Sequence, residues 1–137
     1  MADKSNKVVH ISGKRKMSIA RATIQKGTGI VRINKKSIEI ISPEMAREKI
    51  REPLLLAGDI VKNINIDVEV HGGGIMSMAD AVRLAIAKGL VEYTGNKELK
   101  KTFLQYDRHL IVADVRRTEP QKPCRSAARG GKQTSKR

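Results

Sequence analysis

Apolar and polar residues alternate in two places along this chain, and each alternation predicts a half-buried β-strand. Residues 18–25 put Ala20, Ala22 and Ile24 on one face and polar residues on the other. Residues 64–70 put four β-branched aliphatic residues on one face and three polar residues, two of them acidic, on the other. We expect both strands to turn their aliphatic face to a core. The acidic face of residues 64–70 should then point away from an anionic partner.

Shorter apolar runs lie on both sides of the first strand. Residues 8–11 and 30–33 each have the composition of a short strand. The segments 12–16 and 26–29 contain the glycines and lysines that are typical of turns. The pattern therefore predicts a β-hairpin made of residues 18–25 and 30–33.

A first helix is expected to start at Ser42-Pro43-Glu44. This triplet offers a side-chain cap, a proline at the first helical position and an acid near the positive end of the helix dipole. We expect the helix to run through Ile50. Pro53 removes a backbone donor and should kink the helix or restart it.

A second helix is predicted over residues 77–93. Ser77 and Asp80 have the spacing of a capping box, and apolar residues recur after them with a helical period. A third, shorter helix is expected to end at Leu104. Residues 110–115 should form a last short strand or extended segment.

The net charge of +14 is concentrated at the two ends of the chain. Residues 1–37 hold 10 basic residues and 1 acidic, residues 38–115 hold 10 and 12, and residues 116–137 hold 8 and 1. This asymmetry favours a protein that binds a polyanion. The cations of the predicted strands should lie along one edge and one face of the sheet, and they are Lys14, Arg15, Lys16, Arg21 and Arg32.

Residues 116–137 form a basic tail without any Val, Ile, Leu, Met or aromatic residue. Ordering its backbone would cost about 1–2 kcal/mol per residue with no apolar burial in return. We therefore predict a single α/β domain, residues 1–115, followed by a disordered tail, residues 116–137, that becomes ordered on RNA. The basic residues of this tail that we expect to bind RNA are Arg116, Arg117, Lys122, Arg125, Arg129 and Lys132.

The composition also limits the other classes of function. Because the chain has only two Tyr, one Phe and no Trp, it offers few platforms for stacking bases, and we expect contacts with phosphates and folded RNA. The single cysteine, Cys124, excludes an internal disulfide and suggests a reducing compartment. The three histidines are far apart, so no metal or cofactor is predicted. No apolar run has the length of a membrane span and no secretory signal is present, which favours a cytoplasmic protein.

Gly72-Gly73-Gly74, before the second helix, leaves two interpretations open. Free amides at a helix start can bind phosphate, or the glycines can allow another backbone segment to pass close by. Gly13-Lys14 does not begin a phosphate loop, because Arg15 stands where Ser or Thr must hold magnesium. No arrangement of Ser, His, Asp or Cys predicts a catalytic site.

Several blocks, in order along nearly the whole chain, resemble one protein family. They are Gly13-Lys14-Arg15-Lys16-x-x-Ile19-Ala20-Arg21-Ala22, Glu52-Pro53-Leu54-x-x-Ala57-Gly58, Gly72-Gly73-Gly74 followed by Ala79-x-Ala81-x-Arg83-x-Ala85-Ile86-Ala87, and the ending Ser135-Lys136-Arg137. Together they are similar to the ninth protein of the small ribosomal subunit, in its archaeal form.

The resemblance implies a two-layer α/β sandwich with a four-stranded sheet, helices on one face and a left-handed β-α-β crossover. It also implies a structural protein in the head of the small subunit, bound to ribosomal RNA and to neighbouring ribosomal proteins, with no small-molecule substrate. Arg129, Gln133 and the N-terminal basic turn would contact ribosomal RNA. The tail would reach the peptidyl-site tRNA, which Ser135, Lys136 and Arg137 would touch.

Two other functions remain open on the residues alone. A free basic nucleic-acid-binding protein would need a recognition helix rich in Arg, Asn and Gln, and the helix predicted over residues 77–93 has only Arg83 and Lys88 as basic residues. A phosphotransferase-like enzyme would need a phosphate loop or a set of metal-holding carboxylates, and the sequence shows neither. We therefore expect a structural ribosomal protein and no enzyme.

Overall fold

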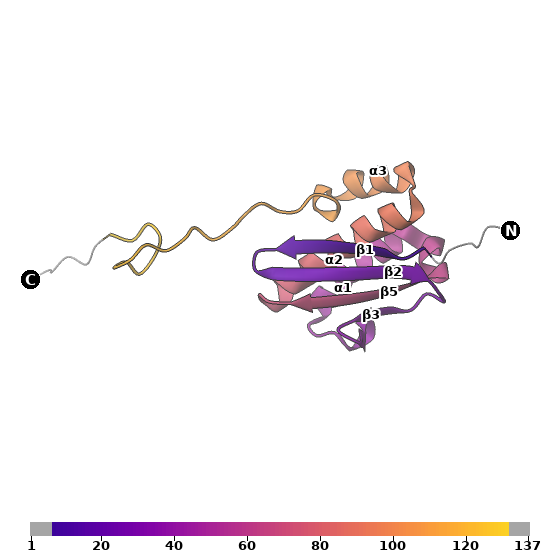
Figure 1. Ribbon diagram of the computed structural model, residues 1–137, viewed down its shortest axis with the longest axis horizontal. Helices are drawn as coiled ribbons and strands as arrows, with labels where there is room; N and C mark the ends of the chain where they lie inside the picture. The colour runs from indigo at the N-terminus through magenta and orange to yellow at the C-terminus, as the bar shows by residue number, and fades with distance from the viewer. Residues whose placement is uncertain (1–6, 132–137) are drawn as a thin grey trace, which may run out of the picture.

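The computed structural model describes residues 7–131 of the chain. They form an α+β domain in two layers, with a mixed β-sheet on one side and helices behind it, from which the tail projects (Figure 1). The strands are β1 (Val9–Arg15), β2 (Ser18–Lys26), β3 (Val31–Ile33), β4 (Lys36–Ser37) and β5 (Ile64–His71). Their order in the sheet is β1-β2-β5-β3-β4, and β3 is parallel to β5 while the other pairs are antiparallel.

The sheet has five strands where four were expected, because the two-residue β4 pairs with β3 at the edge.

The helices are α1 (Glu44–Ala57), α2 (Ile75–Thr94) and α3 (Lys97–Tyr106), and short 3₁₀ helices lie at Ile38–Ile40, Gly58–Asn63 and Arg108–Leu110. The central helix is α2, which packs against β1, β2 and β5 on one side and against α1 and α3 on the other.

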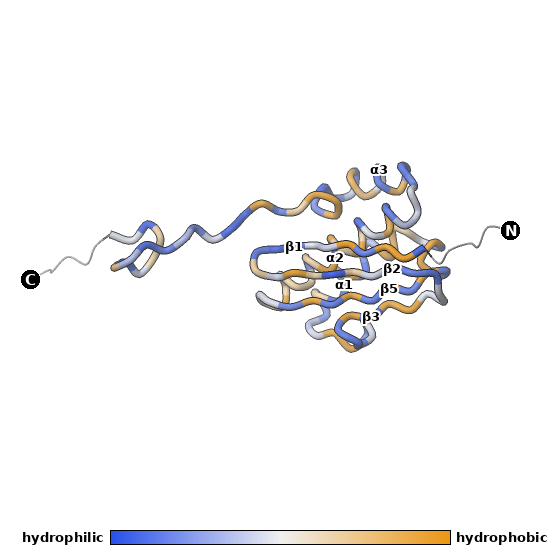
Figure 2. The backbone as a smooth tube through the Cα atoms, viewed as in Figure 1, coloured by the Kyte–Doolittle hydropathy of each residue, from blue (hydrophilic) through white to orange (hydrophobic). Residues whose placement is uncertain are grey.

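Alternation along β2 and β5 builds the core, as the sequence predicted. Ala20, Ala22 and Ile24 of β2 are at most 1% exposed, and Ile66 of β5 is fully buried. The polar residues between them face solvent, and the resulting change of hydropathy along the strands is drawn in Figure 2. The buried face of α2 covers these residues and closes the core.

The predicted hairpin of residues 18–25 and 30–33 is wrong. β5 lies between β2 and β3, and β3 pairs with β5 in parallel. The side chain of Asn65 in β5 accepts hydrogen bonds from the backbone N–H groups of Thr28 and Ile30 at 2.9 and 3.2 Å, so the loop after β2 passes over the start of β5. β2 forms its hairpin with β1 instead, because β1 continues through Arg15 rather than ending at residue 11, and β3 turns back into the short β4.

The helix starts differ from the prediction. Ser42 and Ser77 cap nothing, since α1 has Pro43 and α2 has Gly74 at the N-cap position, both without a side-chain cap. α1 also continues past Pro53 to Ala57, because Pro53 packs into the core and this burial offsets the lost backbone hydrogen bond.

Both helices extend beyond the residues expected for them, α1 to Ala57 and α2 to Thr94. Gly58 ends α1 and Gly95 ends α2, both with a positive φ. α3 begins where Asn96 accepts a hydrogen bond from the backbone N–H of Glu98 at 2.8 Å. Within residues 110–131 the structure contains no strand, so the extended segment expected at 110–115 is irregular chain after a 3₁₀ turn.

Candidate nucleic-acid interface

Two segments that are far apart in sequence meet at one end of the domain. The turn between β1 and β2 contains Lys16, and the Arg117 guanidinium donates a hydrogen bond to the carbonyl oxygen of Lys16 across 101 residues of sequence. A pocket of about 270 Å³ opens there, and Arg15, Lys16, Arg116, Arg117 and Thr118 line it. We name this surface the cationic end and define it as the exposed residues Lys14, Lys16, Arg116 and Arg117.

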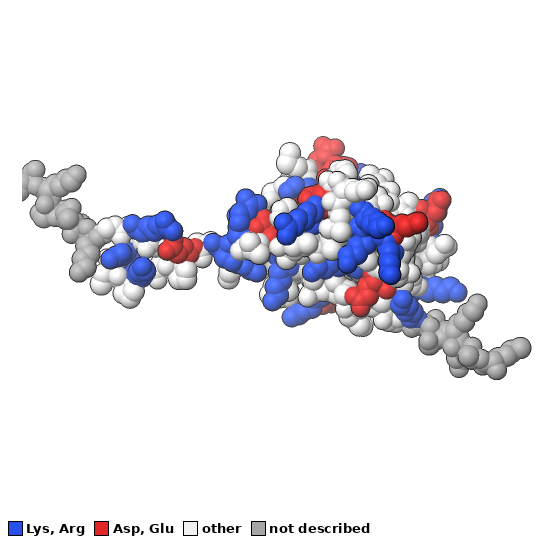
Figure 3. All heavy atoms as spheres, turned by 90° about the horizontal axis from the view of Figure 1, so that it is seen from above, with Lys and Arg blue, Asp and Glu red and all other residues white. Residues whose placement is uncertain are grey.

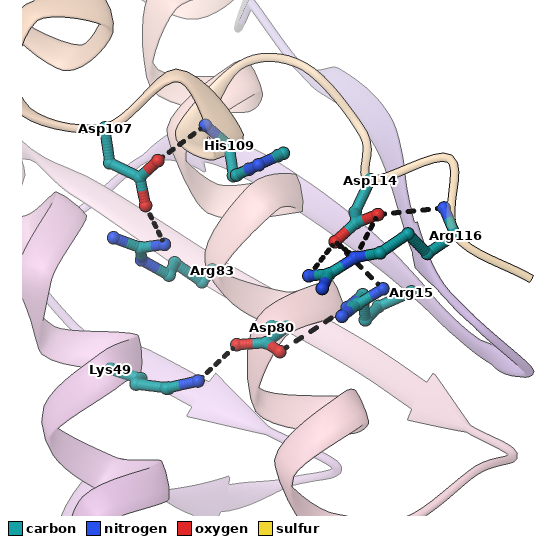
Figure 4. Close-up of polar contacts among 8 residues, drawn as sticks. All are labelled: Arg15, Lys49, Asp80, Arg83, Asp107, His109, Asp114 and Arg116. Atoms are coloured by element: carbon teal, nitrogen blue, oxygen red, sulfur yellow. Dashed lines mark hydrogen bonds and ion pairs between the residues drawn. The ribbon is translucent and has the colours of Figure 1, made fainter.

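Arg15 belongs to the same strand end, but its side chain points between the sheet and the helices (Figure 4). Its Nη1 lies 3.0 Å from Asp114 Oδ2 and its Nε lies 3.7 Å from Asp80 Oδ2, and the side chain is 15% exposed. The expectation that Arg15 shares a face with Lys14 is therefore wrong, because β1 includes both residues and neighbours in a strand point to opposite faces.

Asp114 holds the root of the tail. Its carboxylate accepts hydrogen bonds from the backbone N–H of Arg116 at 2.9 Å and from Arg116 Nη2 at 2.7 Å, and it faces Arg15. These hydrogen bonds from Arg116 are the main reason why the pKa of Asp114 lies well below its usual value. The ionised carboxylate thus links the inner Arg15 to the outer Arg116 and sets the course of the chain where the tail departs (Figure 4).

A second group of ion pairs ties the helices together next to this root (Figure 4). Lys49 Nζ of α1 lies 2.8 Å from Asp80 Oδ1 of α2, and Arg83 Nη1 of α2 lies 2.7 Å from Asp107 Oδ2 after α3. Arg83 also pairs with Glu52 of α1. Burial alone would raise the pKa of Asp107, but the hydrogen bonds from the backbone N–H of His109 and from Arg83 lower it below its usual value.

The outer face of the sheet mixes positive and negative charge. Arg21 of β2 is the cross-strand partner of Glu69 in β5, and Arg32 of β3 is the partner of Asp67. All four residues are exposed. The expected separation of an acidic face from a basic face is therefore wrong, because Arg21, Arg32 and the acids of β5 occupy outward positions of one sheet.

The described part of the tail adds further exposed cations. Lys122 and Arg125 are exposed, and Arg129 Nε lies 2.8 Å from Glu119 Oε2. Residues 116–131 contain no helix or strand. The predicted contacts at Lys132, Gln133, Ser135, Lys136 and Arg137 lie outside the described residues.

The structure gives a packing reason for two of the three glycines before α2. A Cβ on Gly72 would lie 2.6 Å from the carbonyl oxygen of Met17, and one on Gly73 would lie 2.1 Å from Ser18 Oγ. The buried Ser18 hydroxyl donates a hydrogen bond to the carbonyl of Gly72 at 2.8 Å. Of the two interpretations left open, close passage of the β1–β2 turn accounts for Gly72 and Gly73.

Sequence reasoning missed the acids that organise this region. The sequence pattern indicates a capping role for Asp80 and gives Arg83 no partner, although both join the helices through ion pairs. The spacing Asp114-x-Arg116 was the available signal for the root of the tail, since an acid two residues before a basic residue can accept that residue's own N–H.

The part of the chain from residue 7 to residue 131 shows no group of three His, Cys, Asp or Glu side chains placed to hold a metal ion. Its helices are also all too short or too polar to span a membrane.

The fold and the site together define a small, basic α+β protein with exposed cations, unpaired within residues 7–131, where the tail leaves the domain. Comparison with known proteins identifies the family within this class. The family model described as ribosomal protein S9/S16 matches residues 13–137. The small ribosomal subunit protein uS9 of Methanococcus maripaludis strain C7 is 53% identical over 121 residues, which cover 88% of this chain and 90% of that protein. The uS9 protein of Methanococcus vannielii is 52% identical with the same coverage.

The chain therefore belongs to the ribosomal protein S9 family, in the archaeal form that its sequence resembles. This is a family of structural proteins of the small ribosomal subunit, not of enzymes, and it places the chain in the ribosome, in the cytoplasm.

Proposed function

We propose that the chain binds small-subunit ribosomal RNA through its cationic end and its basic tail. The observation that carries this proposal is the convergence of Lys16 and Arg117 from opposite ends of the sequence, with Lys14 in β1 two residues before Lys16. All three are exposed, and none of them forms an ion pair with another described residue. Cations kept free of carboxylates are available to neutralise phosphates and to release counterions from RNA.

In this proposal Arg15 supports the interface from behind. Its ion pair with Asp114 holds the carboxylate that orients Arg116 toward the outside. Arg21 contributes less than the cationic end, because Glu69 lies opposite it on the same face. The tail residues Lys122, Arg125, Arg129, Lys132 and Gln133 continue the RNA contact beyond the domain.

We further propose that the end of the tail touches the peptidyl-site tRNA through Ser135, Lys136 and Arg137. The support is the match of the family model up to residue 137, together with the basic, non-apolar composition of the tail. Neighbouring ribosomal proteins of the subunit head are the remaining partners of this proposal. The connection from β3 through α1 to β5 joins parallel strands, and we propose the left-handed crossover of the family for it.

Replacing Lys14, Lys16 and Arg117 with Gln is expected to flatten the salt dependence of RNA binding. The slope of log affinity against log salt concentration is negative, and each lost phosphate contact should reduce its magnitude by about 0.7–0.9. The magnitude should therefore be smaller by roughly 2 to 3 in the triple variant. The three side chains are exposed, so the thermal midpoint should stay nearly unchanged. The measurement is the affinity of the full chain for purified small-subunit ribosomal RNA over a series of KCl concentrations.

The control variant replaces Arg47, Arg51 and Lys62 with Gln. It removes the same charge from side chains that are already paired with carboxylates, so the slope should stay near that of the unmodified protein. If the variant at Lys14, Lys16 and Arg117 has the same salt dependence of RNA binding as the unmodified protein, the cationic end is not part of the RNA interface.

A further inference from the structure

α3 turns a row of cations outward. Its buried residues Leu99 and Phe103 pack toward the core, and the opposite side of the helix carries the exposed Lys97, Lys100 and Lys101. Arg108, in the 3₁₀ helix that follows, is exposed as well. At about 1.5 Å per residue, Lys97 to Lys101 span roughly 6 Å along the helix axis, which lets the row face adjacent phosphates of one RNA strand.

The pairing of charges distinguishes α3 from α1. In α1 the three cations Arg47, Lys49 and Arg51 all lie in ion pairs with nearby carboxylates. None of the three lysines of α3 forms an ion pair within residues 7–131, and neither does Arg108. The cations of α1 are thus paired within the described part of the protein, whereas the lysines of α3 are not, although the exposed Glu98 lies three residues before Lys101.

Such a row carries a cost in the free protein. Lys97 lies three residues before Lys100 and four before Lys101, and like charges at these spacings destabilise a helix by about 0.2–0.5 kcal/mol per pair. Leu104, on the lysine side of the helix, also stays 40% exposed, and Tyr106 at the end of α3 is 56% exposed. Both features favour a surface that an anionic partner covers over one that only serves solubility.

α3 itself lies at the edge of the domain from which the tail leaves (Figure 1). Figure 1 shows α3 above β1 and directly before the segment that becomes the tail. Seen from this side in Figure 3, Lys and Arg side chains extend over the domain from the tail root, with fewer Asp and Glu among them.

We propose that the outer face of α3, with Lys97, Lys100, Lys101 and Arg108, is a second RNA-binding surface. It binds a backbone segment of ribosomal RNA that is separate from the segment at the cationic end. The inference rests on the proposed function, because it assumes that the chain binds ribosomal RNA at all. It extends that function to a helix that was not among the expected RNA contacts.

The test replaces Lys97, Lys100 and Lys101 with Gln, which has a similar helix propensity. For the full chain on purified small-subunit ribosomal RNA, the magnitude of the slope of log affinity against log salt concentration should decrease by about 2 to 3, at about 0.7–0.9 per phosphate contact. Hydroxyl-radical footprinting of the same complexes should show reduced protection at nucleotides other than those exposed by the cationic-end variant. The thermal midpoint should not fall, since these lysines have no partner in the described protein to lose.

The control variant at Arg47, Arg51 and Lys62 and the cationic-end variant are measured in parallel. This inference is overturned, and the proposed function stands, if the α3 variant leaves the salt dependence unchanged while the cationic-end variant makes it less steep. Equal changes in the α3 variant and the control would also overturn it, because net charge alone would then be responsible. If neither the α3 variant nor the cationic-end variant changes the slope, the proposed function fails as well.

Discussion

Deleting Ser135, Lys136 and Arg137 is expected to weaken tRNA binding at the peptidyl site by about tenfold to a few hundredfold. Each factor of ten in affinity corresponds to about 1.4 kcal/mol of binding free energy. Charged hydrogen bonds to phosphates contribute about 1.5–3 kcal/mol each, and less where water reaches them. Other contacts to the tRNA share the load, so the loss should stay within this range. Subunit assembly should remain intact, because these residues lie at the far end of a tail whose earlier cations remain.

The measurement is the tRNA affinity of subunits assembled with the shortened protein, taken together with the assembly yield. A matched variant with Lys136 and Arg137 changed to Gln keeps the length of the tail and isolates the effect of charge. Normal tRNA affinity would show that the end of the tail is elsewhere. Failed assembly would place these residues in the ribosomal RNA interface instead.

Replacing Phe103 with Ala is expected to cost about 3–5 kcal/mol of unfolding free energy. Phe103 is the only Phe of the chain and is fully buried, and it belongs to the core cluster that also contains Leu90 and Leu110. The substitution removes the buried ring and leaves a cavity under α3, which packs against both α1 and α2. Urea unfolding of the free protein measures the change.

Tyr106→Ala in the same helix is the control for Phe103→Ala. Because the ring of Tyr106 is 56% exposed, its removal should change the unfolding free energy by no more than about 0.5 kcal/mol. A loss below about 1 kcal/mol for Phe103→Ala would mean that α3 is not anchored by this ring.

Features that depend on neighbours in sequence were predictable. The buried face of β5 follows from residues that alternate within one strand, and its burial is as expected. The stripe of α2 likewise follows from a helical period, and the apolar residues of that stripe are buried. Each of these depends on the periodicity of a single element.

Features that depend on distant residues were not predictable. β3 follows β2 in sequence, but β5 pairs with both, and the loop between β2 and β3 is held by the Asn65 side chain and by backbone hydrogen bonds to Asn63 and Ile64. A short apolar run does not encode its partner, so the hairpin was the simpler expectation.

The orientation of Arg15 was missed for a related reason. As a residue of a basic turn it would have faced solvent, but as the last residue of β1 it faces Asp80 and Asp114. These partners lie 65 and 99 residues away in sequence. Composition indicated that this region is basic, and the fold decides which of its cations remain free.

The central claim is that the tail root and the tail lie against ribosomal RNA. Cys124 tests it directly, because it is the only cysteine of the chain and is exposed in the tail. An iron–EDTA group attached to its thiol produces hydroxyl radicals that cut nearby nucleic acid in assembled small subunits. The account predicts cuts in the small-subunit ribosomal RNA that are absent with the Cys124→Ser protein. Subunits that contain the labelled protein but show no cuts in their RNA would contradict it.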